Sequence, residues 1–228
     1  MKLLALETST EACSAALYLE GKMISRFRHA PRLQTDLLLP MVEELLAESG
    51  MTLADMDALA YSRGPGAFTG VRIAAAAVQA MAFARDLPVL AVSSLQTLAQ
   101  GAYRQHGAHR VLAVFDARMN EVYIGAYAWR DGLMQPLGNE HLCAPTALPA
   151  ELLCEPAAFF AAGNGVAVHE AALRAQCTLS GVAPDFFPAA EDVVPLALAL
   201  HAQGGACAPE LALPVYLRDE VWKKLPGR

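Results

Sequence analysis

The sequence predicts an α/β protein of two subdomains, each with a mixed β-sheet flanked by helices. Short apolar runs typical of buried strands alternate along the chain with longer helix-forming segments. A β-hairpin followed by alternating strands and helices occurs clearly in residues 1–105 and again, in weaker form, in residues 106–228. The repetition predicts two related units, as an ancient duplication would produce. We expect the last helix, 191–203, to pack back on the first unit.

The elements of the first unit are predicted from apolar runs for strands and from caps, apolar stripes and closing glycines for helices. In chain order they are strands at 3–7, 14–19 and 23–28, a helix at 36–49, a strand at 57–61, a helix at 69–85, a strand at 89–92, and a helix capped by Ser93 or Ser94 that runs towards Tyr103.

The elements of the second unit carry weaker signals, because proline-rich turns interrupt them. They are strands at 111–115, 121–129 and 133–137, a short helix at 147–153, a strand at 157–162, and helices at 168–176 and 191–203. Gly163-Asn164-Gly165 follows the strand 157–162 and is a weak match to a phosphate-binding turn.

The most informative segment, Ser62 to Ile73, joins a strand to a helix through a glycine-bounded turn. Gly64 and Gly66 allow another backbone or a ligand to come close, and Thr69 or Gly70 is expected to cap the helix. A tight turn before a helix N-terminus favours an anion or a docked backbone. No Gly-Lys-Ser/Thr follows, so the segment is not a P-loop. A well-built strand-to-helix turn is the alternative.

Helix 69–85 is rich in alanine and apolar on every side, so it requires cover on every side. One face must pack on its own sheet. The other face meets either helix 36–49 of the same chain or a second chain, since small residues allow helices to approach closely.

Composition limits the classes of function. Hydrophobic residues make up 55% and charged residues 18% of the chain, and the net charge is −6. These values argue against disorder and against a stand-alone nucleic-acid binder, which needs a basic stripe. The only mild basic cluster is at the C-terminus, with Arg218, Lys223, Lys224 and Arg228.

The five cysteines form no CxxC pair, and no leader or membrane-spanning run is visible. Reduced thiols in a cytoplasmic protein are therefore expected.

No catalytic or metal-binding constellation is evident. The six histidines include no helical pair at i and i+4, and no GxSxG motif is present. Glu7, Thr8 and Ser9 follow the first strand, where hydroxyls and turn amides suit phosphate oxygens. They suit the turn's own backbone groups equally well. Asp116 and Arg118 are expected to pair, either as a salt-bridged turn or as part of a ligand or partner site.

Four blocks in chain order resemble the TsaB (YeaZ) family, and the second is highly specific. The blocks are Leu3-Leu4-Ala5-Leu6-Glu7-Thr8-Ser9-Thr10, Ser62-Arg63-Gly64-Pro65-Gly66-Ala67-Phe68-Thr69-Gly70-Val71-Arg72-Ile73, Asp116-Ala117-Arg118-Met119 and Pro214-Val215-Tyr216-Leu217-Arg218. The resemblance implies the actin-like ATPase fold shared with sugar kinases. The family often has Asp where Glu7 stands and His-Ser-Glu near Leu33-Gln34-Thr35-Asp36, which weakens any claim of independent nucleotide binding.

The resemblance also implies a role. The expected protein is a non-catalytic subunit that supports threonylcarbamoyl transfer to N6 of the tRNA adenosine beside the anticodon. It is expected to dimerise with the TsaD paralogue, to assemble with the TsaE ATPase, and to form a homodimer when alone. The chain is expected to contact tRNA only as part of the complex, and no membrane is expected to be involved. No cofactor is expected to bind firmly to the chain alone, and ATP and Mg²⁺ only in the complex. A small-molecule kinase or ATPase of the same fold is the alternative.

Two sets of site residues follow from the resemblance. Helices 36–49 and 69–85 are expected to form the partner interface, through Leu38, Met41, Val42, Leu45, Val71, Ala74, Ala75, Val78 and Ala82. For Val71 and Ala74, packing on the sheet is the alternative. The residues expected to lie near a nucleotide in the complex are Glu7, Thr8, Ser9, Arg63, Gly64, Pro65, Gly66, Thr69, Gly70, Arg72, Asp116 and Arg118.

Overall fold

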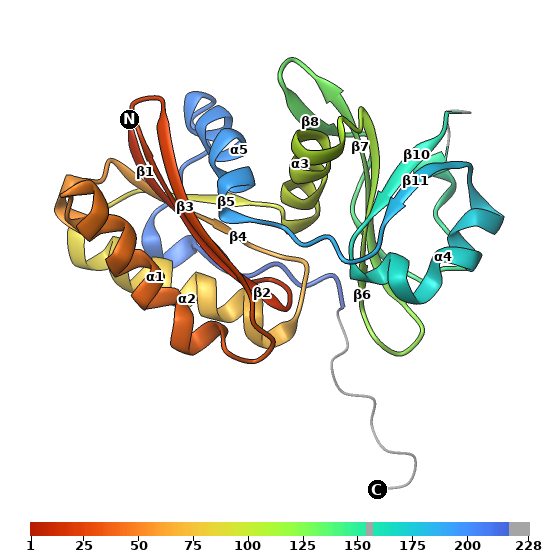
Figure 1. Cartoon of the computed structure of the whole chain (residues 1–228), viewed down its shortest axis with the longest axis horizontal. Helices are drawn as coiled ribbons and strands as arrows, with labels where there is room; N and C mark the ends of the chain where they lie inside the picture. Colours follow the sequence, from red (N-terminus) through yellow and green to blue (C-terminus); the bar gives the residue numbers. More distant parts are fainter. Residues whose placement is uncertain (154–156, 219–228) are drawn as a thin grey trace, which may run out of the picture.

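The computed structural model describes residues 1–153 and 157–218 and consists of two α/β lobes side by side (Figure 1). Cys154 and the basic residues Lys223, Lys224 and Arg228 lie outside the described residues. Within the described part, no helix is both long enough and apolar enough to cross a membrane.

The first lobe is built on a five-stranded sheet with the strand order β3-β2-β1-β4-β5. Strands β3, β2 and β1 are antiparallel neighbours, whereas β1, β4 and β5 run parallel. The strands are β1 (Lys2–Glu7), β2 (Ala12–Leu19), β3 (Lys22–His29), β4 (Ala58–Ser62) and β5 (Val89–Val92).

The second lobe repeats this arrangement, with the strand order β11-β10-β6-β7-β8 and β9 paired to β7. Again three antiparallel neighbours, β8, β7 and β6, continue into the parallel strands β10 and β11. The strands are β6 (Arg110–Asp116), β7 (Val122–Arg130), β8 (Leu133–Pro136), β9 (His141–Cys143), β10 (Phe159–Ala162) and β11 (Leu179–Ala183). The repeated mixed sheets confirm the predicted two-lobed, actin-like α/β fold.

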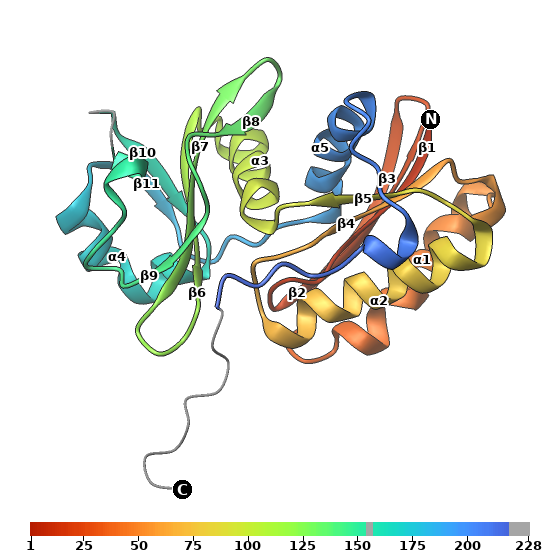
Figure 2. The ribbon, with the colours of Figure 1, turned by 180° about the vertical axis from the view of Figure 1, so that it is seen from behind.

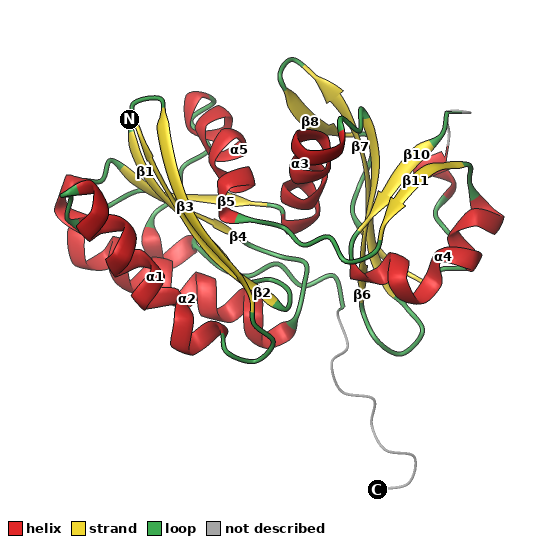
Figure 3. Ribbon diagram, in the orientation of Figure 1, coloured by secondary structure: helices red, strands yellow, loops and turns green. Residues whose placement is uncertain are grey.

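Helices cover both faces of each sheet (Figure 3). α1 and α2 pack on one face of the first sheet and α5 on the other, whereas α3 and α4 pack on opposite faces of the second. The helices are α1 (Gln34–Ser49), α2 (Phe68–Arg85), α3 (Ser94–His106), α4 (Asn164–Gln176) and α5 (Ala190–Ala202), with 3₁₀ turns at Leu53–Asp55, Ala150–Leu153 and Pro209–Leu211.

α5 follows the last strand of the second lobe, yet it packs on the sheet of the first. Its apolar residues Val193 and Ala197 contact buried residues of β1 and β4, among them Leu3 and Ala60. All four side chains have no exposed surface, so the helix is part of the first lobe's core.

Several boundaries differ from the sequence prediction. α2 begins at Phe68 with Ala67 as its cap residue, so the expectation of a cap at Thr69 or Gly70 is wrong. α4 begins at Asn164 rather than 168, because the helix starts directly from the glycine turn after β10. Strands β9 and β11 have no counterpart in the prediction, since they are short and only partly buried.

After α5, the chain returns across the first lobe, and its described part stops at Arg218 between the lobes (Figure 2). Cys207 pairs with the edge strand β5 through two backbone hydrogen bonds with Val89, of 2.8 and 2.9 Å. Residues Leu213–Arg218, which we term the strap, then cross from the first lobe to the second, where Arg218 contacts Glu121.

Candidate functional site between the two lobes

The glycine turn before α2 sits directly on the polar turn after β1. The Ala67 amide donates to the Ser9 carbonyl at 2.7 Å, and the Thr8 hydroxyl donates to the Gly70 carbonyl at 2.7 Å. A Cβ atom on Gly66 or Gly70 would overlap the Ser9 or Thr8 carbonyl oxygen. These two glycines are therefore required by a close backbone approach.

Glu7 lies beneath this contact with no exposed surface. Its Oε1 accepts a hydrogen bond from the Ser9 amide, and its Oε2 has no partner. Burial raises the pKa of Glu7 to about 7, although the hydrogen bond from the Ser9 amide opposes the rise. Glu7, Thr8 and Ser9 were expected to lie near a nucleotide, but their burial means that the structure does not present these side chains to a ligand.

The other residues of the glycine motif serve mainly to build the turn. Pro65 is buried, whereas Thr69 is exposed. The Arg63 amide donates to the Val92 carbonyl at 2.8 Å, which holds the turn against β5. The Gly64 amide donates to the Ser94 hydroxyl at 3.0 Å and so joins the turn to the start of α3.

Arg72 has a separate place on the surface. Its guanidinium carbon lies 3.3 Å from the centroid of the Phe68 ring and 4.7 Å from that of Tyr216. This cation–π geometry directs Arg72 towards the strap.

The side chains predicted for the partner interface are buried inside the monomer, so that residue assignment is corrected. They face the first sheet, because α1 and α2 use their apolar stripes to cover it. The buried residues are Leu38, Met41, Val42, Leu45, Val71, Ala74, Ala75, Val78 and Ala82. A charge at Ala75 or Val78 would disturb this core rather than test a partner surface.

The outer faces of the same two helices expose a different set of apolar residues. Phe83 is 81% and Leu39 is 51% exposed, and Ala76 and Ala80 are exposed on the same side of α2 as Phe83. Residues at i, i+4 and i+7 lie along one face of a helix. An apolar face of α2 thus points away from the monomer core.

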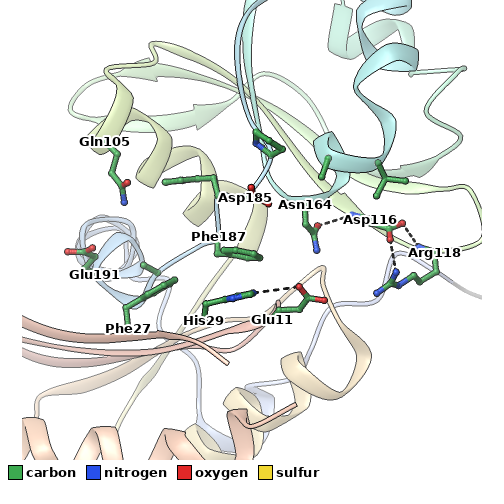
Figure 4. Close-up of a pocket in the computed structure, with 15 residues that line it drawn as sticks. Glu11, Phe27, His29, Gln105, Asp116, Arg118, Asn164, Asp185, Phe187 and Glu191 are labelled. Atoms are coloured by element: carbon green, nitrogen blue, oxygen red, sulfur yellow. Dashed lines mark hydrogen bonds and ion pairs between the residues drawn. The ribbon is translucent and has the colours of Figure 1, made fainter. Parts of the chain in front are cut away.

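A pocket of about 800 Å³ lies between the lobes (Figure 4). Both lobes and the segment before α5 contribute polar and aromatic side chains to it. They include Glu11, Phe27, His29, Gln105, Asp116, Arg118, Asn164, Asp185, Phe187 and Glu191. His29 stacks on Phe187 with a centroid distance of 4.7 Å and lies 3.8 Å from the Glu11 carboxylate.

The charges of this pocket do not favour a phosphate. Four carboxylates line it, those of Glu11, Asp116, Asp185 and Glu191, against one arginine, Arg118. Arg118 is already paired with Asp116 at 3.1 Å, as the sequence predicts. A triphosphate alone would meet net negative charge here, and like charges repel at these distances.

The last residue of β6, Asp116, and Arg118 in the loop that follows both lie at the pocket. The Asp116 amide donates to the side-chain oxygen of Asn164 at 3.0 Å, which ties the loop to the start of α4. Arg118, Met119 and Asn120 have φ values of 62°, 56° and 59°. Three successive non-glycine residues in the left-handed region are uncommon, and such backbone strain tends to occur at functional sites.

A second pocket, of about 510 Å³, lies where this loop meets the glycine turn and the strap. It is lined by Glu11 and Phe68 from the first lobe, Tyr123 from the second, and Tyr216 and Arg218 from the strap. Ser9 contributes to its wall but has no exposed surface.

Sequence reasoning missed the strap as part of the site, although the Pro214–Arg218 block was visible. It also missed His29 and Phe187, for which a single sequence carries no signal. Asn164 was noted in the sequence only as part of Gly163-Asn164-Gly165, a weak match to a phosphate-binding turn.

The four thiols in the part of the chain that the structure describes are poor nucleophiles. Burial raises the pKa of Cys13 to about 11 and raises those of Cys143, Cys177 and Cys207 above the usual range. Within residues 1–153 and 157–218, no group of three or more His, Cys, Asp or Glu residues is arranged to hold a metal ion.

Known proteins match this chain over most or all of its length. A family model described as "TsaD: tRNA N6-adenosine threonylcarbamoyltransferase" matches residues 28–213. The "tRNA threonylcarbamoyladenosine biosynthesis protein TsaB" of Escherichia coli (strain K12) is 42% identical over 231 residues that cover both chains completely. The protein of the same name from Haemophilus influenzae is 40% identical and covers 100% of this chain and 98% of its own.

A solved structure shows the same similarity in three dimensions. "YeaZ from Pseudomonas aeruginosa" superimposes with a TM-score of 0.87 at 47% identity, covering 95% of this chain and 99% of its own. Full-length identity to two TsaB proteins, the family-model match and this superposition show that the chain belongs to the TsaB (YeaZ) family.

Proposed function

We propose that this chain is a non-catalytic partner subunit in the biosynthesis of tRNA threonylcarbamoyladenosine. The names of its full-length relatives support the pathway, and the description of the family model supports kinship with the transferase. In this proposal the chain dimerises with TsaD, assembles with the TsaE ATPase, and forms a homodimer when alone. It meets tRNA through the complex and works in the cytoplasm.

The buried turn Thr8–Thr10 after β1, which we term the sealed turn, supports the non-catalytic part of the proposal. Thr8 and Ser9 are the hydroxyls that would suit phosphate oxygens, and the α2 end of the glycine turn covers them. Glu7 is enclosed with them. Together with the acidic pocket, this burial favours a chain that holds no nucleotide firmly by itself, so that ATP and Mg²⁺ enter only in the complex.

The isolated chain is expected to transfer no threonylcarbamoyl group. The test incubates purified protein with ATP, threonine, bicarbonate and unmodified tRNA and analyses the tRNA nucleosides by mass spectrometry. The reconstituted multisubunit system is the positive control. Modified adenosine formed by this chain alone would disprove the non-catalytic role.

We assign the partner surface to the outer faces of α1 and α2. The exposed residues Leu39, Ala76, Ala80 and Phe83 form apolar surface on a helix pair whose other side is fully packed. Such a face is stabilised when a second protein removes it from water.

Ala76→Glu and Phe83→Glu are expected to weaken TsaD binding by about 100-fold or more. The reason is that an unpaired charge buried in an interface costs several kcal/mol, and each 1.4 kcal/mol is tenfold in affinity. Isothermal titration calorimetry with purified TsaD measures the effect. Both positions are exposed, so circular dichroism and the melting temperature should stay unchanged.

Ala171→Glu is the matched control, because Ala171 is an exposed helical alanine on α4 of the other lobe. It should bind TsaD like the parent chain. Parent-like affinity in both α2 variants would place the interface elsewhere.

The alternative, a small-molecule kinase or ATPase, rests on the interlobe pocket alone. It requires steady ATP turnover by the pure chain, which a coupled phosphate-release assay detects. The acidic lining and the sealed turn both disfavour it.

A further inference from the structure

The strap is bound to the first lobe by its backbone. The Tyr61 hydroxyl donates to the Leu213 carbonyl at 3.0 Å, and the Val215 amide donates to the Arg63 carbonyl at 2.7 Å. Gly64 has φ +105°, and a Cβ on it would lie 2.9 Å from the Val215 carbonyl oxygen. The glycine turn is therefore shaped to receive the strap.

A ring contact adds to this attachment. Tyr216 lies against Phe68 with a centroid distance of 6.3 Å, and the Arg72 guanidinium lies over both rings. Tyr216 is 43% exposed, so this anchor is on the surface.

Arg218 then binds the strap to the second lobe. Its Nη2 donates to the Ala117 carbonyl at 3.0 Å and lies 2.8 Å from Glu121 Oε2. Its Nη1 lies 3.5 Å from the Met119 sulfur. All three partners belong to the loop between β6 and β7, in which residues 118–120 have left-handed backbone angles.

A second arginine holds the lobes together at the other end of the interlobe pocket. Arg104 of α3 makes a bidentate contact with Asp192 of α5, at 2.7 and 2.9 Å, and also pairs with Glu191 at 2.7 Å. Figure 4 shows Glu191 at one end of the pocket and Arg118 at the other.

The two contacts differ in exposure. The difference lies in the carboxylates: the Asp192 side chain is 2% and the Glu121 side chain 35% exposed, whereas the arginines Arg104 and Arg218 are 37% and 21% exposed. An arginine with two hydrogen bonds to a buried carboxylate holds it more firmly than an arginine with one contact to a partly exposed carboxylate, which water and salt can reach.

We propose that the strap is a releasable latch for the interlobe cleft. Arg218 holds the second lobe against the first, and loss of its contact with Glu121 lets the lobes separate about the Arg104–Asp192 contact, which persists. The opening of both pockets between the lobes is thereby set by one surface arginine. This inference concerns the chain alone and does not depend on the proposed function.

Single-molecule energy transfer between the lobes tests the latch. Dyes are attached through azide-bearing residues at Ala47 of α1 and Ala175 of α4, both exposed, with the native cysteines left in place. The parent chain should give one narrow population of high transfer efficiency. In Arg218→Ala, and equally in Glu121→Ala, the fraction of molecules with low efficiency should rise at least threefold.

Three further variants make the test specific. Tyr216→Ala should open the lobes as well, because it detaches the strap from the other side. The charge exchange Arg218→Glu with Glu121→Arg should recover part of the parent distribution, because it restores the ion pair but not the hydrogen bond to the Ala117 carbonyl. Arg26→Ala is the control, since it removes a partly exposed arginine that pairs with Glu44 and Glu48 within the first lobe.

An Arg218→Ala distribution that matches those of the parent chain and Arg26→Ala would overturn the latch. If Arg218→Ala does not fold, a salt titration of the parent chain decides instead. The low-efficiency fraction should then rise with ionic strength, and a constant fraction would reject the proposal.

Discussion

Replacing Gly70 with alanine is expected to lower the free energy of unfolding by about 4 kcal/mol, from up to about 3 for overpacking and about 1 for a lost hydrogen bond. The added methyl group would overlap the Thr8 carbonyl oxygen, which is backbone and cannot rotate away. The start of α2 must then lift from the turn after β1 and break the hydrogen bond between Thr8 and Gly70. Urea unfolding followed by circular dichroism measures the change.

Gly138→Ala is the matched control for this substitution. Gly138 also has an ordinary backbone angle, and a Cβ there would make contacts of 3.7 Å or more with Glu151 and Leu152. Its stability should stay within about 0.5 kcal/mol of the parent chain, as is usual away from special contacts. A Gly70→Ala protein as stable as Gly138→Ala would show that the close seat of α2 is not required.

Glu7→Gln is expected to remove the part of the parent chain's pH-dependent stability between about pH 4.5 and pH 8 that comes from Glu7. The pKa of Glu7 rises from 4.5 to about 7 on folding, because burial disfavours its charged form. The folded state therefore binds more protons than the unfolded state in this range, and stability falls as pH rises. The loss is fully present above the folded pKa and amounts to about 3 kcal/mol.

The glutamine variant keeps an acceptor for the Ser9 amide but carries no ionisable group. At pH 8 it should be the more stable protein by about 3 kcal/mol, and the advantage should shrink to zero near pH 4. Asp192, whose pKa is also raised by burial, to about 6, contributes equally to both proteins and cancels in the difference.

Chemical denaturation at several pH values measures this difference. Glu43→Gln, at an exposed position on α1, should follow the parent chain. A constant gap between Glu7→Gln and the parent across the range would mean that Glu7 does not titrate in the folded protein near neutral pH.

Local sequence signals predicted most of the elements in both lobes. The apolar runs 14–19 and 23–28 predicted the strands β2 and β3, and the Ser93 cap, whose hydroxyl accepts a hydrogen bond from the Gln96 amide, predicted the start of α3. These signals are reliable because turn and cap chemistry involves neighbours in the chain. Strand β11 was missed because its exposed and half-buried residues lack a continuous apolar run.

The faces of α2 show where a single sequence is insufficient. Val71, Ala74 and Val78 form a clear apolar stripe, which the prediction assigned to a partner, with packing on the sheet as the alternative for Val71 and Ala74. In the structure this stripe packs on the first sheet, whereas Ala76 and Phe83 are exposed to solvent. An alanine-rich helix is apolar on both sides, so its periodicity cannot say which side faces the sheet. Contacts across the chain, such as Val215 with Arg63, leave no local signal at all.

The position of α5 has a consequence for how the protein is made. The first sheet is complete in sequence by Val92, but one of its faces, with Leu3, Ala5 and Leu90, stays uncovered until α5 has been synthesised. During translation, the ribosome therefore carries a nascent chain with an open apolar sheet while the second lobe is still being made. Completion of the first lobe is thus a late and long-range event, because α5 covers strands that were synthesised at the start of the chain.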